Sequence, residues 1–131
     1  MIIDTSAIVA ILRAEPEAAL FANAIADSRS RKVSAVSFVE AAAVIDASHD
    51  AVASRRFDQL FREARLVVEP VSFSQAQTAR DAYRDFGKGS GHPAGLNLGD
   101  CFAYALAKES GEPLLFKGQD FSKTDVAAAL P

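Results

Sequence analysis

The chain has 131 residues and a formal net charge of −3, and half of its residues are hydrophobic. This length is typical of one domain, here expected over residues 1–131, with a core that needs no disulfide. No apolar run is long enough to cross a membrane and the start lacks the features of a signal peptide, so we expect a cytoplasmic protein. The single Cys101 cannot form an internal disulfide, and the negative charge argues against a protein that coats nucleic acid by bulk electrostatics.

Two strand-to-helix units are predicted in the first half of the chain. An apolar start ends abruptly at Asp4, and Pro16 ends one helix and opens the next. Ser37 and Glu40 have the spacing of a capping box that opens a later helix. In chain order the pattern predicts a strand at residues 1–3, helices at 7 to about 15 and 16–26, a strand at 33–36, and helices at 41–48 and 51–64.

The second half repeats this alternation. Consecutive Leu66, Val67 and Val68 are typical of a strand that is covered on both faces. Gly87 and Gly111 are expected to end helices. The pattern predicts a strand at residues 66–71, a helix at 74–86, a glycine-rich loop at 88–97, a helix at 101–110 and a strand at 113–116.

Strands that alternate with helices predict an α/β fold, with a central, mostly parallel sheet of about four to five short strands flanked by helices. Ligands of such folds gather at the carboxyl ends of the strands. Asp4, Glu40 and Asp120 follow predicted strands, and Asp100 starts the helix that leads into the last one. Acidic side chains from four distant parts of the chain are therefore expected at one rim.

Each of these acids also has an ordinary structural interpretation. Asp4 and Asp100 occupy helix-capping positions, and Glu40 completes a capping box with Ser37. Carboxylates at one rim repel one another, however, unless cations or basic groups bind them. Ligands that are all oxygen atoms suit Mg²⁺ or Mn²⁺, and such ions suggest phosphodiester hydrolysis by an activated water.

Four segments resemble the PIN-domain toxins called VapC. They are Asp4-Thr5-Ser6, the Ser37-Phe38-Val39-Glu40 segment, residues 96–107 (LNLGDCFAYALA) and residues 114–121 (LLFKGQDF). The similarity covers essentially the whole chain in order and spacing, and the two C-terminal segments make it specific.

This resemblance implies a PIN fold, Mg²⁺- or Mn²⁺-dependent endoribonuclease activity and the toxin role in a type II toxin–antitoxin system. It also implies a structured RNA substrate such as tRNA or rRNA, a homodimer, and neutralisation by a cognate VapB-type antitoxin in a hetero-oligomer. Asp4, Glu40 and Asp100 match the metal-binding acids of the family. The hydroxyl of Thr5 or Ser6 matches the group that supports the site, although either residue could instead cap the helix.

The fourth acid of the family has no direct counterpart. Gly118 stands where many relatives carry an acid, and Asp120 either fills that role from nearby or caps the following turn. Basic residues and a histidine flank the expected rim, where they could contact RNA or be ordinary surface residues. These candidates are Arg13, Lys88, His92 and Lys117.

Two other functions are compatible with parts of the pattern. A phosphorylated receiver-like domain would use Asp4 and Lys117, but it needs an acid after a middle strand, and Ser72-Phe73-Ser74 follows that strand instead. A catalytically weak PIN-like protein that binds RNA or a partner without cutting is the stronger alternative, because Gly118 lacks a carboxylate.

Overall fold

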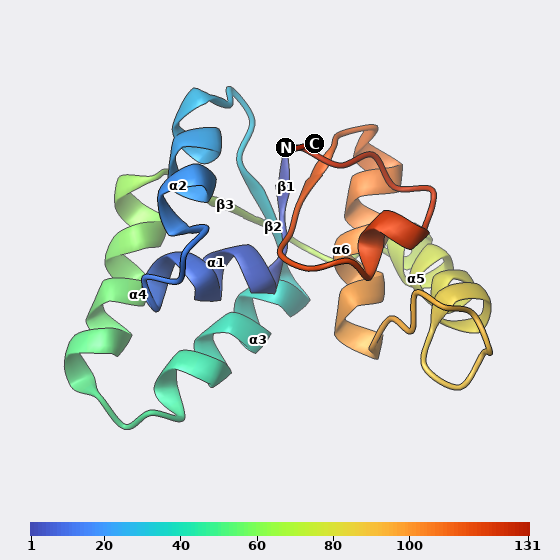
Figure 1. Cartoon of the computed structure of the whole chain (residues 1–131), viewed down its shortest axis with the longest axis horizontal. Coiled ribbons are helices and arrows are strands. Elements are labelled where there is room, and N and C mark those ends of the chain that lie inside the picture. Colours follow the sequence, from blue (N-terminus) through green and yellow to red (C-terminus); the bar gives the residue numbers. More distant parts are fainter.

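The computed structural model describes residues 1–131 and shows a small sheet between two groups of helices (Figure 1). The strands are β1 (Ile2–Ile3), β2 (Lys32–Ser34), β3 (Val67–Glu69) and β4 (Leu114–Leu115). The helices are α1 (Thr5–Leu12), α2 (Ala18–Asp27), α3 (Ala35–Asp46), α4 (Ala51–Glu63), α5 (Phe73–Phe86) and α6 (Leu98–Ser110), with a short 3-10 helix η1 (Phe121–Lys123). The predicted α/β fold with four to five strands is confirmed.

All strand pairs are parallel, and the strand order is β3-β2-β1-β4. Ile2 of the inner strand β1 is in register with Lys32 of β2 and with Leu114 of β4. The backbone N–H of Asp4 donates to the carbonyl of Leu115 at 2.9 Å. The start of the chain is therefore held between a segment about thirty residues away and one near the other end.

The core has two halves, one on each face of the sheet. Side chains alternate along a strand, so Ile3 and Leu115 pack with α1 to α4, whereas Ile2 and Leu114 pack with α5 and α6. Figure 1 shows α1, α2 and α4 on one side of the sheet and α5 and α6 on the other. Burial of β1 and β4 on both faces explains why these two strands are entirely apolar.

The start of α3 differs from the prediction. β2 ends at Ser34, whose Oγ accepts a hydrogen bond from the backbone N–H of Val36 at 3.3 Å and caps α3. Ser37 is buried inside the helix, and its hydroxyl has no partner. The predicted capping box of Ser37 and Glu40 is wrong, and Glu40 lies in the second turn of α3. Pro16 likewise precedes α2, which begins at Ala18.

β3 lies at one edge of the sheet and pairs only with β2. The side chains of Val67 and Val68 are 54% and 39% exposed, so the prediction that this strand is covered on both faces is wrong. Consecutive apolar residues indicate a strand, but they do not say whether it lies inside the sheet or at its edge. No helix in the structure has the length and apolar character that a membrane crossing requires.

Candidate metal centre

Asp4 lies at the junction of β1 and α1 and caps that helix. Its side chain is 3% exposed, and Oδ2 accepts hydrogen bonds from the backbone N–H and the hydroxyl of Ser6, at 3.0 and 2.6 Å. Burial raises the pKa of Asp4, the bonds from Ser6 oppose this, and the charge of Glu40 raises the pKa further. Asp4 is therefore both a helix cap and a buried acid beside another carboxylate.

Ser6 links Asp4 to the far end of the chain. Its Oγ accepts a hydrogen bond from the backbone N–H of Lys117, which follows β4, at 3.0 Å. Ser6 therefore joins the segment that leads to Asp120 to the carboxylate of Asp4. Asp4 is the N-cap of α1, so neither Thr5 nor Ser6 caps this helix.

Glu40 reaches from α3 toward the other acids. Thr5 Oγ1 donates to Glu40 Oε1 at 3.2 Å and also lies 3.3 Å from the carbonyl of Ser37. The carboxyl group rests directly against the backbone of Gly99, in the first turn of α6. Burial and the charge of Asp100 raise the pKa of Glu40, whereas the bond from Thr5 lowers it. The contact with Gly99 is a feature that the sequence pattern did not indicate.

Asp100 lies in the first turn of α6 and completes a capping box with Asn97. Its Oδ2 accepts a hydrogen bond from the N–H of Asn97 at 3.0 Å. Burial raises the pKa of Asp100 to about 6, and the charges of Asp4 and Asp120 add to this shift. The charge of Glu40 raises the pKa of Asp4, and the charge of Asp100 raises the pKa of Glu40. The charges of Asp4 and Asp120 in turn raise the pKa of Asp100, so the four acids form one electrostatic cluster at the rim.

Asp120 is the most exposed member of this cluster. It precedes η1, but its side chain makes no capping hydrogen bond. Gly118 has a φ of +98°, a left-handed conformation that favours glycine and would strain an acidic residue. The side chain of Asp120 therefore does not cap the following turn, but it lies near enough to Asp100 to raise the pKa of that residue.

The cluster is not closed around a single point. No group of three or more His, Cys, Asp or Glu side chains lies close enough together to hold one ion. Asp4 faces Ser6, Glu40 faces Thr5, and Asp100 is bonded to Asn97. A shared cation therefore requires rotation of some of these side chains toward one another. The donors are all carboxylate oxygens, the ligands that hard divalent cations prefer.

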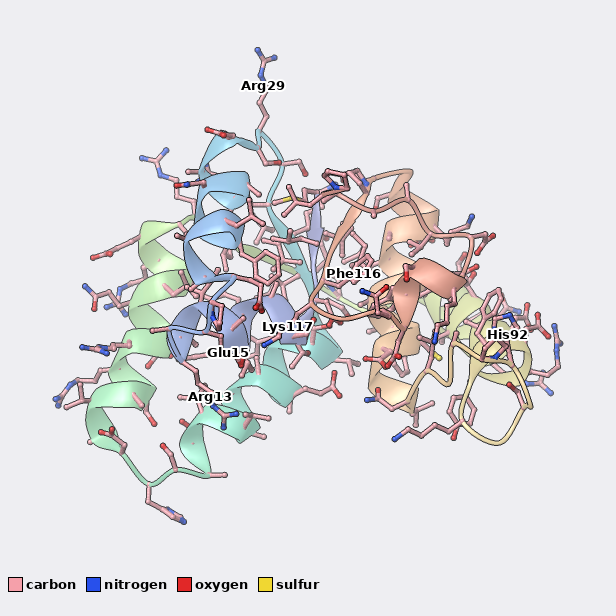
Figure 2. All side chains as sticks on the ribbon, viewed as in Figure 1. Arg13, Glu15, Arg29, His92, Phe116 and Lys117 are labelled. Carbon is pink, nitrogen blue, oxygen red and sulfur yellow. The ribbon has the colours of Figure 1, made fainter.

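The predicted RNA contacts differ in their positions. Lys88 is exposed, and its charge lowers the pKa of Asp100, which shows that it lies near the cluster. Lys117 Nζ forms ion pairs with Glu15 at 2.8 Å and Glu17 at 3.1 Å, and Figure 2 shows Lys117 beside Glu15. Arg13 is the C-cap of α1, at the opposite end of that helix from Asp4.

His92 stabilises the glycine-rich loop and is not part of the acidic cluster. Its Nδ1 accepts a hydrogen bond from the N–H of Ala94 at 3.1 Å, and its ring packs edge-on against Phe86 at 4.9 Å between centroids. In Figure 2 it lies on the α5 side of the molecule, away from Lys117. Cys101 is buried, and burial raises the pKa of its thiol to about 12, so it is not a ready nucleophile.

Comparisons with known proteins identify the family of this chain and agree with its fold. The model of the PIN domain family matches residues 1–127. Ribonuclease VapC28 of Mycobacterium tuberculosis is 57% identical over 130 residues, which cover 99% of this chain and 98% of that protein. Ribonuclease VapC of Mycolicibacterium smegmatis is 52% identical over 128 residues, 98% of each chain. The chain belongs to the PIN-domain family and, within it, to the VapC ribonucleases.

A solved structure shows the same fold at much lower similarity. The crystal structure of Mycobacterium tuberculosis VapC20, described as a Sarcin-Ricin loop cleaving toxin, superposes with a TM-score of 0.76 and 15% identity. The match covers 96% of this chain and 95% of that one. At this identity the likeness supports the fold alone.

Proposed function

We propose that this protein is the toxin of a type II toxin–antitoxin system and an endoribonuclease that hydrolyses RNA phosphodiester bonds with Mg²⁺ or Mn²⁺. The observation that carries the proposal is the cluster of Asp4, Glu40, Asp100 and Asp120, which brings four separated segments to one rim. The ribonuclease names of relatives that match along the whole chain support the same reaction.

The four carboxylates supply the oxygen ligands that a hard divalent cation prefers, and rotation of some of these side chains would bring them to one ion. Burial and repulsion by neighbouring carboxylates disfavour the ionised forms of Asp4, Glu40 and Asp100, and a bound cation would offset both effects. Asp4, Glu40 and Asp100 would supply the main ligands, and Asp120 would complete the set from the segment after β4. When bound, such an ion lowers the pKa of a water and orients it for attack on a phosphate.

The side chains of this protein prepare the site in three ways. Ser6 fixes the Asp4 carboxylate, and Thr5 restrains Glu40. Lys88 provides a positive charge near Asp100 that can attract a phosphate of the RNA backbone. Lys117 is less suited to this task, because Glu15 and Glu17 already neutralise its charge.

The partners in this proposal follow from membership of the family. A cognate VapB-type antitoxin neutralises the activity, the toxin forms a homodimer, and the pair assembles into a hetero-oligomer. The substrate is a structured RNA such as tRNA or rRNA, because recognition of folded RNA depends on shape and splayed bases.

Cleavage assays test this function directly. Purified protein is incubated with tRNA and rRNA fragments in Mg²⁺ or Mn²⁺, alongside the Asp4→Asn, Asp100→Asn and Asp120→Asn variants. We expect the first two variants to lose at least about 100-fold in cleavage rate, because each removes a buried, charged ligand. We expect a smaller loss for Asp120→Asn, because its side chain is exposed. Expression of the wild type alone should slow growth, and the Asp4→Asn variant should not.

The alternative of a PIN-like protein that binds without cutting makes a different prediction. Its supporting observation is Gly118, which replaces an acid that many relatives carry. If the wild type cleaves no RNA faster than Asp4→Asn and Asp100→Asn do, yet retains RNA with measurable affinity, this alternative replaces the nuclease proposal.

A further inference from the structure

Gly99 is the second residue of α6 and immediately precedes Asp100. Its φ is not among the positive values of the chain, so no left-handed backbone requires glycine here. Glycine also weakens a helix relative to alanine, because it loses more backbone freedom on folding. A glycine in this turn therefore needs a different physical reason.

The reason is the Glu40 carboxyl group. A methyl group built on the Cα of Gly99 would overlap the carboxyl carbon and both carboxyl oxygens of Glu40. The same carboxyl group accepts a hydrogen bond from Thr5 at the start of α1. Glu40 is therefore held between the hydroxyl of Thr5 and the bare backbone of α6.

We propose that Gly99 is a positioning residue for Glu40. Because Gly99 has no side chain, the Glu40 carboxylate can lie against the first turn of α6, beside Asp100. This inference rests on the proposed metal-binding role of Glu40. A methyl group at position 99 displaces the end of the Glu40 side chain, since a flexible side chain moves more readily than a helix backbone.

The first test measures the metal site itself. In Gly99→Ala we expect Mn²⁺ affinity and the kcat/KM of RNA cleavage to fall by about 10- to 100-fold, the range for loss of a group that orients a metal ligand. Combining Gly99→Ala with Glu40→Asp should restore part of both, because a side chain one methylene shorter leaves room for the methyl group. Wild-type Mn²⁺ affinity and cleavage in Gly99→Ala would overturn the proposal.

The second test needs neither metal nor RNA. Thermal unfolding in EDTA compares the effect of Gly99→Ala in the wild-type and Glu40→Ala backgrounds. With Glu40 removed, alanine has room and should raise the Tm, because it favours the helix. With Glu40 present, the rise should be absent or reversed, because the overlap breaks the bond to Thr5.

The outcomes of these tests are distinguishable. An equal change of Tm in both backgrounds means that Gly99 does not act on Glu40, and the inference is wrong. If Gly99→Ala does not fold but the double variant with Glu40→Ala does, the overlap is confirmed. If neither folds, position 99 serves α6 itself, and the inference again fails. Absence of Mn²⁺ binding and RNA cleavage in the wild type would refute the proposed function, while the Tm comparison still decides whether Gly99 positions Glu40.

Discussion

Asp100 has two roles that oppose each other energetically. It caps α6 through Asn97, which stabilises the helix, and it is one of several close carboxylates, which destabilises its ionised form. Its pKa rises from 3.8 to about 6 in the folded protein. A carboxyl group with a higher pKa in the folded than in the unfolded chain lowers stability as pH rises through that interval. The penalty is complete above pH 6 and absent below about pH 4.

The Asp100→Asn variant should therefore be more stable than the wild type in metal-free buffer at neutral pH. We expect a gain of about 1 to 2 kcal/mol, less than the full pKa shift implies, because water partly screens the group. An asparagine oxygen can still accept the hydrogen bond from the N–H of Asn97, so the cap is retained. Urea unfolding in EDTA between pH 4 and pH 8 measures this gain, which should vanish at the acidic end.

A matched control is Asp58→Asn, on the exposed surface of α4. It removes the same charge outside the acidic cluster, so it should leave stability nearly unchanged at every pH. Equal gains in both variants would mean that net charge, rather than the environment of Asp100, sets the stability.

Local features of the sequence indicate the acids of the candidate site, but not the long-range contacts around them. Asp4, Glu40 and Asp100 are candidates because motifs and strand ends are local features of the sequence. The ion pairs of Lys117 with Glu15 and Glu17 join residues about one hundred positions apart, and no local pattern encodes them. For this reason the sequence alone leaves Lys117 a candidate for RNA contact or an ordinary surface residue.

Among the elements, α3 shows why boundaries are harder to predict than the elements themselves. Its first residues include Val36, Phe38 and Val39, which suit a strand as well as a helix. Ser37 and Glu40 have capping-box spacing by coincidence, while Ser34 is the true cap. Because α3 begins at Ala35, the Glu40 carboxylate has no capping role, and capping does not explain why an acid stands at this position.

Two serine variants test this boundary. Ser34→Ala removes the hydrogen bond to the N–H of Val36 and should lower the free energy of unfolding by about 1 kcal/mol. Ser37→Ala removes a buried hydroxyl that has no partner, so it should be neutral or slightly stabilising. Urea unfolding of the two variants gives the comparison. A larger loss for Ser37→Ala would place the start of α3 where the sequence pattern put it.

At the scale of the whole molecule, the alternation of elements predicted a parallel sheet, and the four strands confirm it. The strand order was not predictable, because pairing joins segments that are far apart in sequence. The exposed edge position of β3 is one result: its valines resemble those of a buried strand, yet 54% of Val67 and 39% of Val68 is exposed.

Binding of divalent cations should stabilise the whole fold, because it relieves repulsion among carboxylates from four segments. A ligand at about ten times its Kd adds about 1.4 kcal/mol, or roughly 4 to 6 °C in Tm for a domain of this size. Thermal unfolding of the wild type in Mg²⁺ or Mn²⁺, compared with EDTA, measures the rise.

Asp4→Asn should lose most of this rise, whereas Asp58→Asn should keep it. A rise of equal size in all three proteins would indicate weak binding elsewhere on the surface rather than at the acidic cluster.

The position of β1 between β2 and β4 also determines when the site can exist. A ribosome releases the amino end of a chain first, but Asp4 donates its backbone N–H to Leu115, near the other end. Until that residue emerges, β1 lacks one of its two neighbouring strands, and the segment that carries Asp120 is absent from the rim. A nascent chain that stops before β4 therefore lacks both Asp120 and the strand that holds Asp4 in place, so under the proposed function RNA cleavage begins only after β4 has been made.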